Sequence, residues 1–269
     1  MRDQIERPLA WTGFLLGLSI GGFFDGILLH QVLQWHHLLS NVAAVQDLRT
    51  QILADGLFHV LMYVIAAVAL YRLWRDRARL AKPGADRTLW GAALMGFGAW
   101  HILDALLSHW LIGLHRIRMD AANPLVWDLI WFFAFGVVPA ILGWLFIRRR
   151  GRGRGSRGRG NTADSSDRSA AAALAMAAVT AGTLAVVPTA DPGDRVLVIF
   201  APGVSSSAAF SALAGIDARV LWTDRGGGVW AVALERPADS WKLHRHGALL
   251  VSNSALAVGC LPWSRPVGI

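Results

Sequence analysis

Four apolar runs in the first 150 residues constrain this chain most, because each can cross a lipid bilayer. A membrane-spanning helix needs roughly 20 predominantly apolar residues. The runs cover residues 9–33, 57–74, 89–114 and 125–147. Backbone polar groups have no water to bond in lipid, so such runs must be helical. The sequence therefore predicts four transmembrane helices, with a kink at Pro139 inside the fourth run.

The composition favours a lipid bilayer as partner and argues against nucleic acid. Charged residues make up only 16% of the chain, whereas soluble domains carry about 25%. The net charge of +8 comes largely from basic clusters at residues 72–87 and 148–159, each of which adjoins an apolar run. Positively charged cytoplasmic loops explain this placement better than a nucleic-acid site, because no recognition motif accompanies the charge.

The same clusters predict the orientation in the membrane. The loops after the first and third runs contain only Arg49, and Arg116 with Arg118, as basic residues. Short loops rich in Lys and Arg stay in the cytoplasm. We therefore expect a cytoplasmic N-terminus in a multi-pass inner-membrane protein, with the loop at residues 38–54 outside.

The rest of the chain differs in character from the four runs. Residues 148–168 are rich in Arg and Gly and predict a flexible linker. Residues 169–188 are Ala-rich and marginally apolar, so we predict a fifth transmembrane helix, with an internal signal-like segment as the alternative. If this helix spans the membrane, the C-terminal domain at residues 189–269 lies outside.

The C-terminal domain is predicted to be small and of the α+β class. Alternating apolar residues and a run of three glycines indicate strands and turns. The order β-α-β-β-α-β suggests a ferredoxin-like domain. The fold class is therefore mainly α, with a four-helix transmembrane domain at residues 1–147. The expected strands are 195–200, 219–222, 229–234 and 248–252, and the expected helices 205–214 and 238–246.

The apolar runs contain many ionisable side chains, and each is a functional candidate because it is costly in lipid. They occupy the second halves of the first and third runs and the first turns of the other two. With the predicted orientation they all lie in the outer half of the bilayer, which a random scatter would not produce. The candidates are Asp25, His30, His36, His37, Asp55, His59, Asp104, His109, His115 and Asp128, with His101 deeper.

Imidazoles and carboxylates that project from facing helices are the usual metal ligands of helix bundles. This ligand set suits a transition metal ion such as iron, copper or zinc. Such a site would serve metal handling for the assembly of a respiratory complex, which would be a partner, or redox chemistry on a lipophilic substrate. The residues do not indicate whether the protein is an enzyme.

Helical geometry predicts how the candidates are arranged. His30 and His37 are seven residues apart and nearly aligned, but separated by ~10 Å at 1.5 Å per residue. We therefore expect His30, His59 and His109 to converge on one ion, with the aspartates around it. His36 or His37 with His115 would form a second site nearer the surface.

Three other interpretations stay open. A b-type haem could use His59 and His109 as an axial pair, although the surplus of aspartate argues against haem propionates nearby. A proton or ion relay is a second alternative, and we expect no internal repeat that would support a transporter. A structural hydrogen-bonded network is the third, because lone intramembrane histidines often link helices.

Three stretches carry a resemblance to a known family: GGFFDGILLHQVLQWHHLLS (residues 21–40), ADGLFHVLMY (54–63) and HILDALLSHWLIGLHRIR (101–118). Over residues 9–147 they resemble an uncharacterised bacterial family of four-helix membrane proteins. The C-terminal 80 or so residues lie outside the resemblance. It implies that the candidate residues other than Asp104 are polar positions of the family. It also implies a second histidine where this chain has Arg116.

Overall fold

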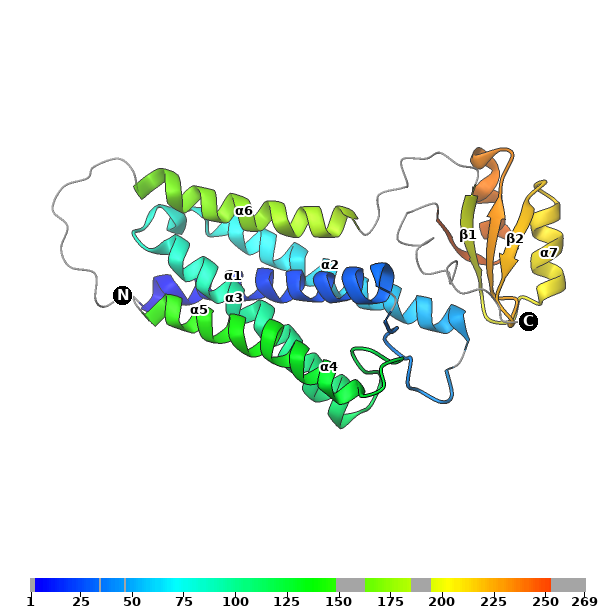
Figure 1. The fold of residues 1–269 in the computed structure, drawn as a ribbon. Coiled ribbons are helices and arrows are strands. Elements are labelled where there is room, and N and C mark those ends of the chain that lie inside the picture. The colour runs from blue at the N-terminus through cyan, green and yellow to red at the C-terminus, as the bar shows by residue number, and fades with distance from the viewer. Residues whose placement is uncertain (1–2, 34, 46, 149–162, 185–194, 253–269) are drawn as a thin grey trace. The chain divides into compact units, whose positions relative to one another are not determined.

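The computed structural model describes residues 3–33, 35–45, 47–148, 163–184 and 195–252. Four helical runs are long and apolar enough to cross a membrane, and they confirm the four predicted helices (Figure 1). These runs are Arg7–Val32, Leu48–Arg75, Ala85–Leu111 and Pro124–Arg148.

Three of the four runs change from α-helix to π-helix along their length. The first run is α1 (Asp3–Asp25) followed by the π-helical η1 (Gly26–Val32), and the third is α3 (Ala85–Asp104) followed by η3 (Ala105–Leu111). The second run, α2 (Leu48–Arg75), is α-helical throughout. The fourth consists of α4 (Pro124–Trp131), the π-helical η4 (Phe132–Val137) and α5 (Val138–Arg148).

The π-helical η4 lies close to Pro139, where we predicted a kink: η4 ends at Val137, and Pro139 is the second residue of α5. Proline lacks a backbone N–H, and its ring collides with the carbonyl of the preceding helical turn. The π-helical turn changes the hydrogen-bonding pattern just before the proline, and the kink itself stays a prediction.

The chain forms two compact units, Met1–Gly26 with Leu57–Thr183, and Ile27–Gly56 with Leu184–Ile269. In the first unit α1 packs most extensively against α3, and α3 also packs against α5. A Cβ atom on Gly17 would lie 1.8 Å from the Ala93 carbonyl oxygen, and one on Gly96 would lie 1.9 Å from the Phe14 carbonyl oxygen. Glycine at both positions therefore lets the two helices pack with their backbones in close approach.

The helices of the first unit have an inverted distribution of polarity. Large apolar side chains such as Val64, Trp74 and Phe133 are at least half exposed. Asp104, His109 and other ionisable side chains are buried instead. In a water-soluble bundle the apolar stripe faces inward. The exposed apolar surface is suited to contact with lipid chains.

A further helix, α6 (Ala163–Leu184), belongs to the first unit. Its side chains Ala171, Leu174 and Ala178 are buried in the core around Leu16, and the Tyr63 hydroxyl donates a hydrogen bond to the Gly182 carbonyl. The apolar part of α6, Ala171–Thr183, is shorter than the four long runs. The fifth span therefore stays a prediction, and most of the predicted linker (149–162) lies outside the described residues.

The second unit contains an antiparallel four-stranded sheet in the order β2-β3-β1-β4. The order of elements is the predicted β-α-β-β-α-β, with a 3-10 helix as the second helix. Its register places Val198 opposite Trp230 of β3 and Val251 of β4. The elements are β1 (Arg195–Phe200), α7 (Ser206–Ala214), β2 (Arg219–Thr223), β3 (Val229–Ala233), η6 (Pro237–His246) and β4 (Ala248–Ser252).

Both faces of this sheet are covered, because successive side chains of a strand point to opposite faces. Val198 and Phe200 of β1 are buried with Leu213 of α7 on one face. Leu197 and Ile199 are buried on the other face, where Ile52 from the first turns of α2 packs against them.

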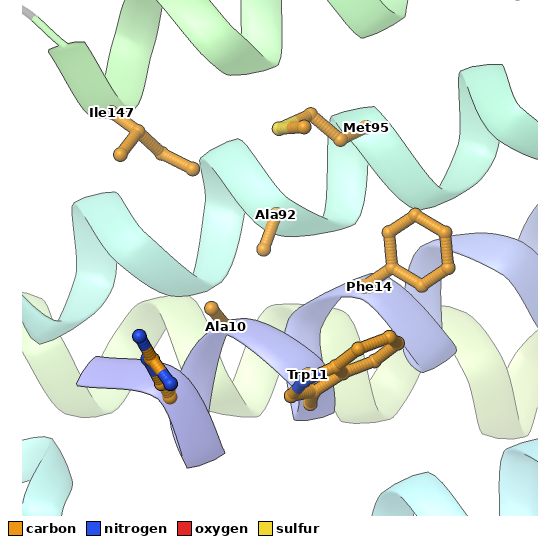
Figure 2. A pocket seen from close by; sticks show the side chains of 7 residues that line it. Ala10, Trp11, Phe14, Ala92, Met95 and Ile147 are labelled. Atoms are coloured by element: carbon orange, nitrogen blue, oxygen red, sulfur yellow. The ribbon is translucent and has the colours of Figure 1, made fainter. Parts of the chain in front are cut away.

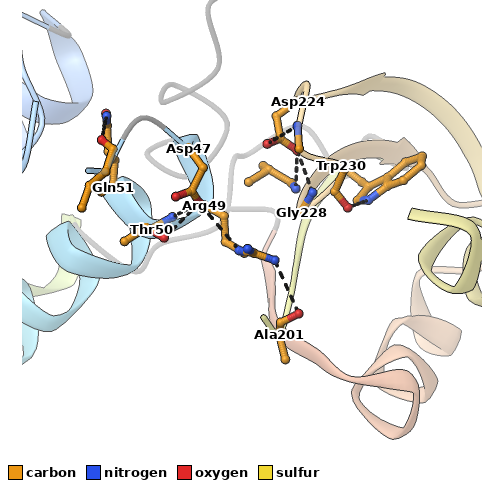
Figure 3. Close-up of polar contacts among 12 residues, drawn as sticks. Asp47, Arg49, Thr50, Gln51, Ala201, Asp224, Gly228 and Trp230 are labelled. Atoms are coloured by element: carbon orange, nitrogen blue, oxygen red, sulfur yellow. Dashed lines mark hydrogen bonds and ion pairs between the residues drawn. The ribbon is translucent and has the colours of Figure 1, made fainter. Parts of the chain in front are cut away.

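Polar contacts accompany this packing at the start of α2 (Figure 3). Asp47 caps the helix by accepting hydrogen bonds from the Thr50 amide and hydroxyl, both at 2.9 Å. Partial burial raises the pKa of the Asp47 carboxyl, but the hydrogen bonds from Thr50 and the Arg49 charge lower it further, so the pKa lies below its ordinary value. Arg49 donates to the Ala201 carbonyl oxygen at 3.5 Å.

Candidate metal centre

Two groups of buried histidine and aspartate side chains lie at the ends of the π-helical segments. We call Asp25, His30 and His36 the first cluster, and Asp104, His109 and His115 the second cluster. In each cluster the three residues offer ligand atoms that all lie within 4.8 Å of one another. His30 and His109, which we expected to share one ion with His59, belong to different clusters.

The second cluster has the geometry of a three-residue ligand set. His109 Nε2 lies 3.0 Å from Asp104 Oδ2, and His115 Nε2 lies 3.7 Å from Asp104 Oδ1. All three side chains are almost completely buried. Ligand atoms that share one ion at roughly 2.0–2.1 Å lie about 3 Å apart, so these separations are compatible with a common ion.

Asp128 of α4 supports the second cluster by contacting the nitrogen of His109 that faces away from Asp104. One carboxylate oxygen, Oδ1, lies 3.1 Å from His109 Nδ1 and accepts a hydrogen bond from the Ile117 amide at 2.9 Å. The other, Oδ2, pairs with the Arg116 guanidinium at 2.8 Å. A carboxylate on the far nitrogen of a histidine fixes the ring and its tautomer, which is how metal-ligating histidines are commonly supported.

The first cluster has the same kind of support within the second unit. His30 Nδ1 lies 3.1 Å from Asp55 Oδ1, and His37 Nδ1 lies 2.7 Å from Asp55 Oδ2. The Leu38 amide donates to Asp55 Oδ1 at 2.8 Å. The rings of His30 and His36 have centroids 4.6 Å apart. Because Nδ1 of His30 already contacts Asp55, Nε2 of His30 is the ring atom suited to a metal ion.

The π-helical segments explain why two residues that are five positions apart in the sequence lie in the same cluster. In an α-helix, Asp25 and His30 would lie on different faces, since neighbours on one face are three or four residues apart. The π-helix bonds residue i to residue i+5, which brings residues five apart into register. The same holds for Asp104 and His109. Short π-helical segments are common at functional sites.

The predicted separation of His30 and His37 is wrong, because the helix ends at Val32. The ~10 Å spacing assumed a continuous helix through both residues. The chain turns instead, and both imidazoles contact the same carboxylate of Asp55. His36 therefore meets His30 from a loop, and His115 meets His109 in the same way after η3 ends at Leu111.

His59 and His101 lie outside both clusters. The His59 ring packs near Phe23 and Phe58, and a Cβ atom on Gly26 would lie 2.7 Å from His59 Nε2. His101 Nδ1 accepts a hydrogen bond from the Trp131 indole at 3.2 Å within a group of aromatic rings. His101 is therefore a buried packing residue in the part of the chain that the structure describes.

The C-terminal histidines, His244 and His246, are exposed. Cys260 lies outside the described residues. An apolar pocket of about 280 Å³ lies near the start of α1 and the end of α5, between Trp11, Met95 and Ile147 (Figure 2). It is at the opposite end of these helices from the second cluster and contains no imidazole or carboxylate.

Chemically, each cluster combines two imidazoles and one carboxylate. Zinc, iron and copper all accept such ligands, and two histidines with one carboxylate leave further coordination positions open. The same side chains can also form a buried ion-pair network without a metal ion, in which each imidazole shares a proton with an aspartate.

Comparison with known proteins agrees with the membrane fold. No curated protein and no solved structure matches the chain. One family model does match, over residues 12–150, which contain most of the first membrane helix, the other three membrane helices and both clusters. Since the match covers more than half of the chain, the protein belongs to the family described as "Predicted membrane protein (DUF2243)".

Proposed function

We propose that this protein is an integral membrane protein that binds transition metal ions, iron, copper or zinc, through its buried histidine and aspartate clusters. The observation that carries the proposal is the second cluster, in which Asp104, His109 and His115 present ligand atoms within 4.8 Å of one another. Asp128 on the far side of His109 supplies the orientation that a ligating imidazole needs.

Burial supports a functional role for these residues. Asp104, His109, His115 and Asp128 are each at most 7% exposed. Ionisable side chains in a membrane helix are costly and are kept where they serve an ion, a proton or a ligand. A simple packing role would be met by apolar side chains at lower cost.

The test is elemental analysis of the full chain, purified in detergent without a polyhistidine tag. We expect at least one transition metal ion per chain, and loss of that metal in a His30→Ala His109→Ala double variant. A His244→Ala variant is the matched control, because it removes an exposed imidazole outside both clusters. Metal content that the double variant leaves unchanged would contradict the proposal.

Haem is the alternative cofactor. Of the proposed axial pair His59 and His109, His109 would have to exchange its present contacts with Asp104 and Asp128 for a porphyrin beside several carboxylates, which the haem propionates disfavour. A visible absorption spectrum of the purified protein distinguishes the two, because b-type haem has an intense Soret band and a bound zinc ion has none.

A proton relay is a second candidate function, and one observation favours it. His109 contacts a carboxylate on each side, Asp104 at 3.0 Å and Asp128 at 3.1 Å, which forms a short chain of proton-exchanging groups. Such chains occur in membrane pumps and transporters. A metal-free protein that moves protons across vesicles, with loss of transport in Asp104→Asn, would favour this function over metal binding.

For the cellular setting we infer the inner membrane of a bacterium, with the basic loops in the cytoplasm and both clusters near the outer face. The contacts of α6 support an outer C-terminal domain. Ala171 shares a core with Leu80, in the basic loop after α2, whereas Gly182 contacts Tyr63, near the middle of α2, so α6 runs away from the basic loop. At this face the proposed site would serve metal handling or redox chemistry. A respiratory complex would be the partner.

A further inference from the structure

The two clusters repeat one sequence pattern. Asp25, His30 and His36 are followed 79 positions later by Asp104, His109 and His115. The π-helical segments keep the same offset, since Gly26–Val32 corresponds to Ala105–Leu111. This regular offset differs from our expectation that the chain contains no internal repeat. Few residues besides the cluster positions are identical between the halves, so the pattern is hard to find in sequence.

The contacts around the clusters repeat as well. Asp55 and Asp128 lie near the start of the helix that follows each cluster, and Oδ1 of each lies 3.1 Å from Nδ1 of the first histidine. Each also accepts a backbone amide, from Leu38 at 2.8 Å and from Ile117 at 2.9 Å, and these amides are again 79 positions apart. Both pairs of imidazole rings meet at an interplanar angle of 69°.

The packing of α1 on α3 follows the same symmetry. Gly17 meets the backbone of Ala93, and Gly96 meets the backbone of Phe14. With the offset of 79, Gly17 corresponds to Gly96 and Phe14 corresponds to Ala93. The two contacts are therefore exchanged by a two-fold relation between the helices.

A charged position differs between the two clusters. His37 contacts Asp55 Oδ2 at 2.7 Å, whereas the corresponding residue is Arg116, which contacts Asp128 Oδ2 at 2.8 Å. An imidazole can be neutral, but a guanidinium in a protein is always charged. The second cluster therefore contains one fixed positive charge that the first cluster lacks.

We propose that the four-helix part is a tandem duplication of a two-helix unit, and that its two clusters have diverged into a tight divalent-cation site and a weak one. The first cluster, with Asp25, Asp55 and neutral imidazoles, balances the charge of one divalent ion. In the second cluster Arg116 already compensates one of the two carboxylates, so a divalent ion there leaves an excess positive charge. This inference rests on the proposed metal-binding function.

The expected size of the effect follows from the position of Arg116. Excess charge is costly in a buried site, because water does not screen it. The Arg116 side chain is 36% exposed, however, so solvent weakens its field. We therefore expect the second cluster to bind a divalent ion about tenfold to a hundredfold more weakly than the first.

The experiment is a titration of the full chain in detergent with Co²⁺, followed by the visible absorption of the bound ion. The unmodified protein is expected to show one tight and one weak site. Arg116→His should strengthen the weak site by tenfold or more, and His37→Arg should weaken the tight site by a similar factor. Arg118→His is the matched control, because Arg118 lies in the same loop and pairs with the exposed Asp120 outside the clusters.

Arg116→Gln separates charge from ligand number, since glutamine removes the charge without adding an imidazole. It should also strengthen the weak site, and it serves as the test if Arg116→His loses helical content by circular dichroism. Two sites of equal affinity, or affinities that change no more in the Arg116 variants than in Arg118→His, would overturn the proposed divergence. Failure of the unmodified protein to bind Co²⁺ at either site would overturn the metal-binding function itself.

Discussion

At the scale of single residues, two aspartates organise the site from the start of the helix after each cluster. Asp55 is 5% exposed and joins His30, His37 and the Leu38 amide. Asp128 is fully buried and joins His109, Arg116 and the Ile117 amide. Each carboxylate thereby ties the loop after one membrane helix to the beginning of the next. In the proposed metal sites these aspartates would position the imidazoles, and the ligand atoms would lie on the other side of the rings.

We predict that Asp55→Asn weakens metal binding by about 10–100-fold, because asparagine cannot carry the negative charge that supports the His30 ring. Equilibrium titration with Co²⁺ measures the effect. Asp120→Asn provides the control, since Asp120 is half exposed and pairs with Arg118 outside the clusters. Equal affinity in the two variants would show that Asp55 does not position a ligand.

At the scale of helices, close backbone contact between α1 and α3 makes a compact bundle possible. Gly17 and Gly96 leave no room for a side chain at their contacts. The π-helical segments η1 and η3 follow directly on these helices and carry His30 and His109. The close packing of α1 on α3 therefore lies directly before the π-helical segments that carry the candidate imidazoles.

Gly17→Ala should destabilise the bundle by about 1–3 kcal/mol, since the added Cβ would collide with the Ala93 backbone. Gly56→Ala is the matched control. No atom lies within 4 Å of a Cβ atom at Gly56, so alanine should stabilise the helix by up to about 1 kcal/mol. Thermal unfolding in detergent, followed by circular dichroism, compares the two. A Gly17→Ala protein as stable as Gly56→Ala would contradict the close approach of α1 and α3.

At the scale of the whole molecule, all candidate ligands come from residues 25–128, while the sheet of residues 195–252 supplies none. The sheet has its own core around Phe200 and Leu213. We therefore treat the membrane helices as the metal-binding part and the C-terminal sheet as a separate domain. The division at residues 147, 168 and 188 is part of that proposal.

A chain truncated after residue 160 should insert into the membrane and keep the metal content of the full protein. The reason is that both clusters and their supporting aspartates are retained. Elemental analysis of the two purified proteins provides the comparison, with circular dichroism to verify helical content. Loss of metal from a truncated protein of unchanged helicity would show that the C-terminal part supplies ligands, and His244, His246 and Cys260 would then be the residues to examine.

The predicted orientation can be tested by cysteine labelling in a Cys260→Ser background. Ser40 lies in the loop between the first two membrane helices, so Ser40→Cys should react with a membrane-impermeant thiol reagent in intact cells. A cysteine in place of Ser156, in the basic linker, should react only after the cells are opened. The reverse result would place the clusters at the cytoplasmic face and contradict the shared outer depth.

The sequence by itself determined the four membrane helices, the C-terminal order of strands and the residue types of the site. Long apolar runs leave a chain in lipid no alternative to helices, because every backbone polar group needs an internal partner. Period-two alternation likewise predicts strands such as β1 without knowledge of their neighbours. The cost of ionisable groups in lipid singled out Asp25, His30 and the other cluster residues.

Only the tertiary structure decided which histidine meets which aspartate. The sequence-based arrangement assumed an α-helical period through His30 and His37, but the helix changes to π-helix at Gly26 and ends at Val32. The change to π-helix rotates all later side chains, and the end of the helix displaces them. Neither event has a distinct sequence signature in an apolar run. The pairing of His37 and Arg116 with Asp55 and Asp128 depends on loops that return to the next helix. Such contacts between distant residues are fixed by packing, which local sequence does not encode.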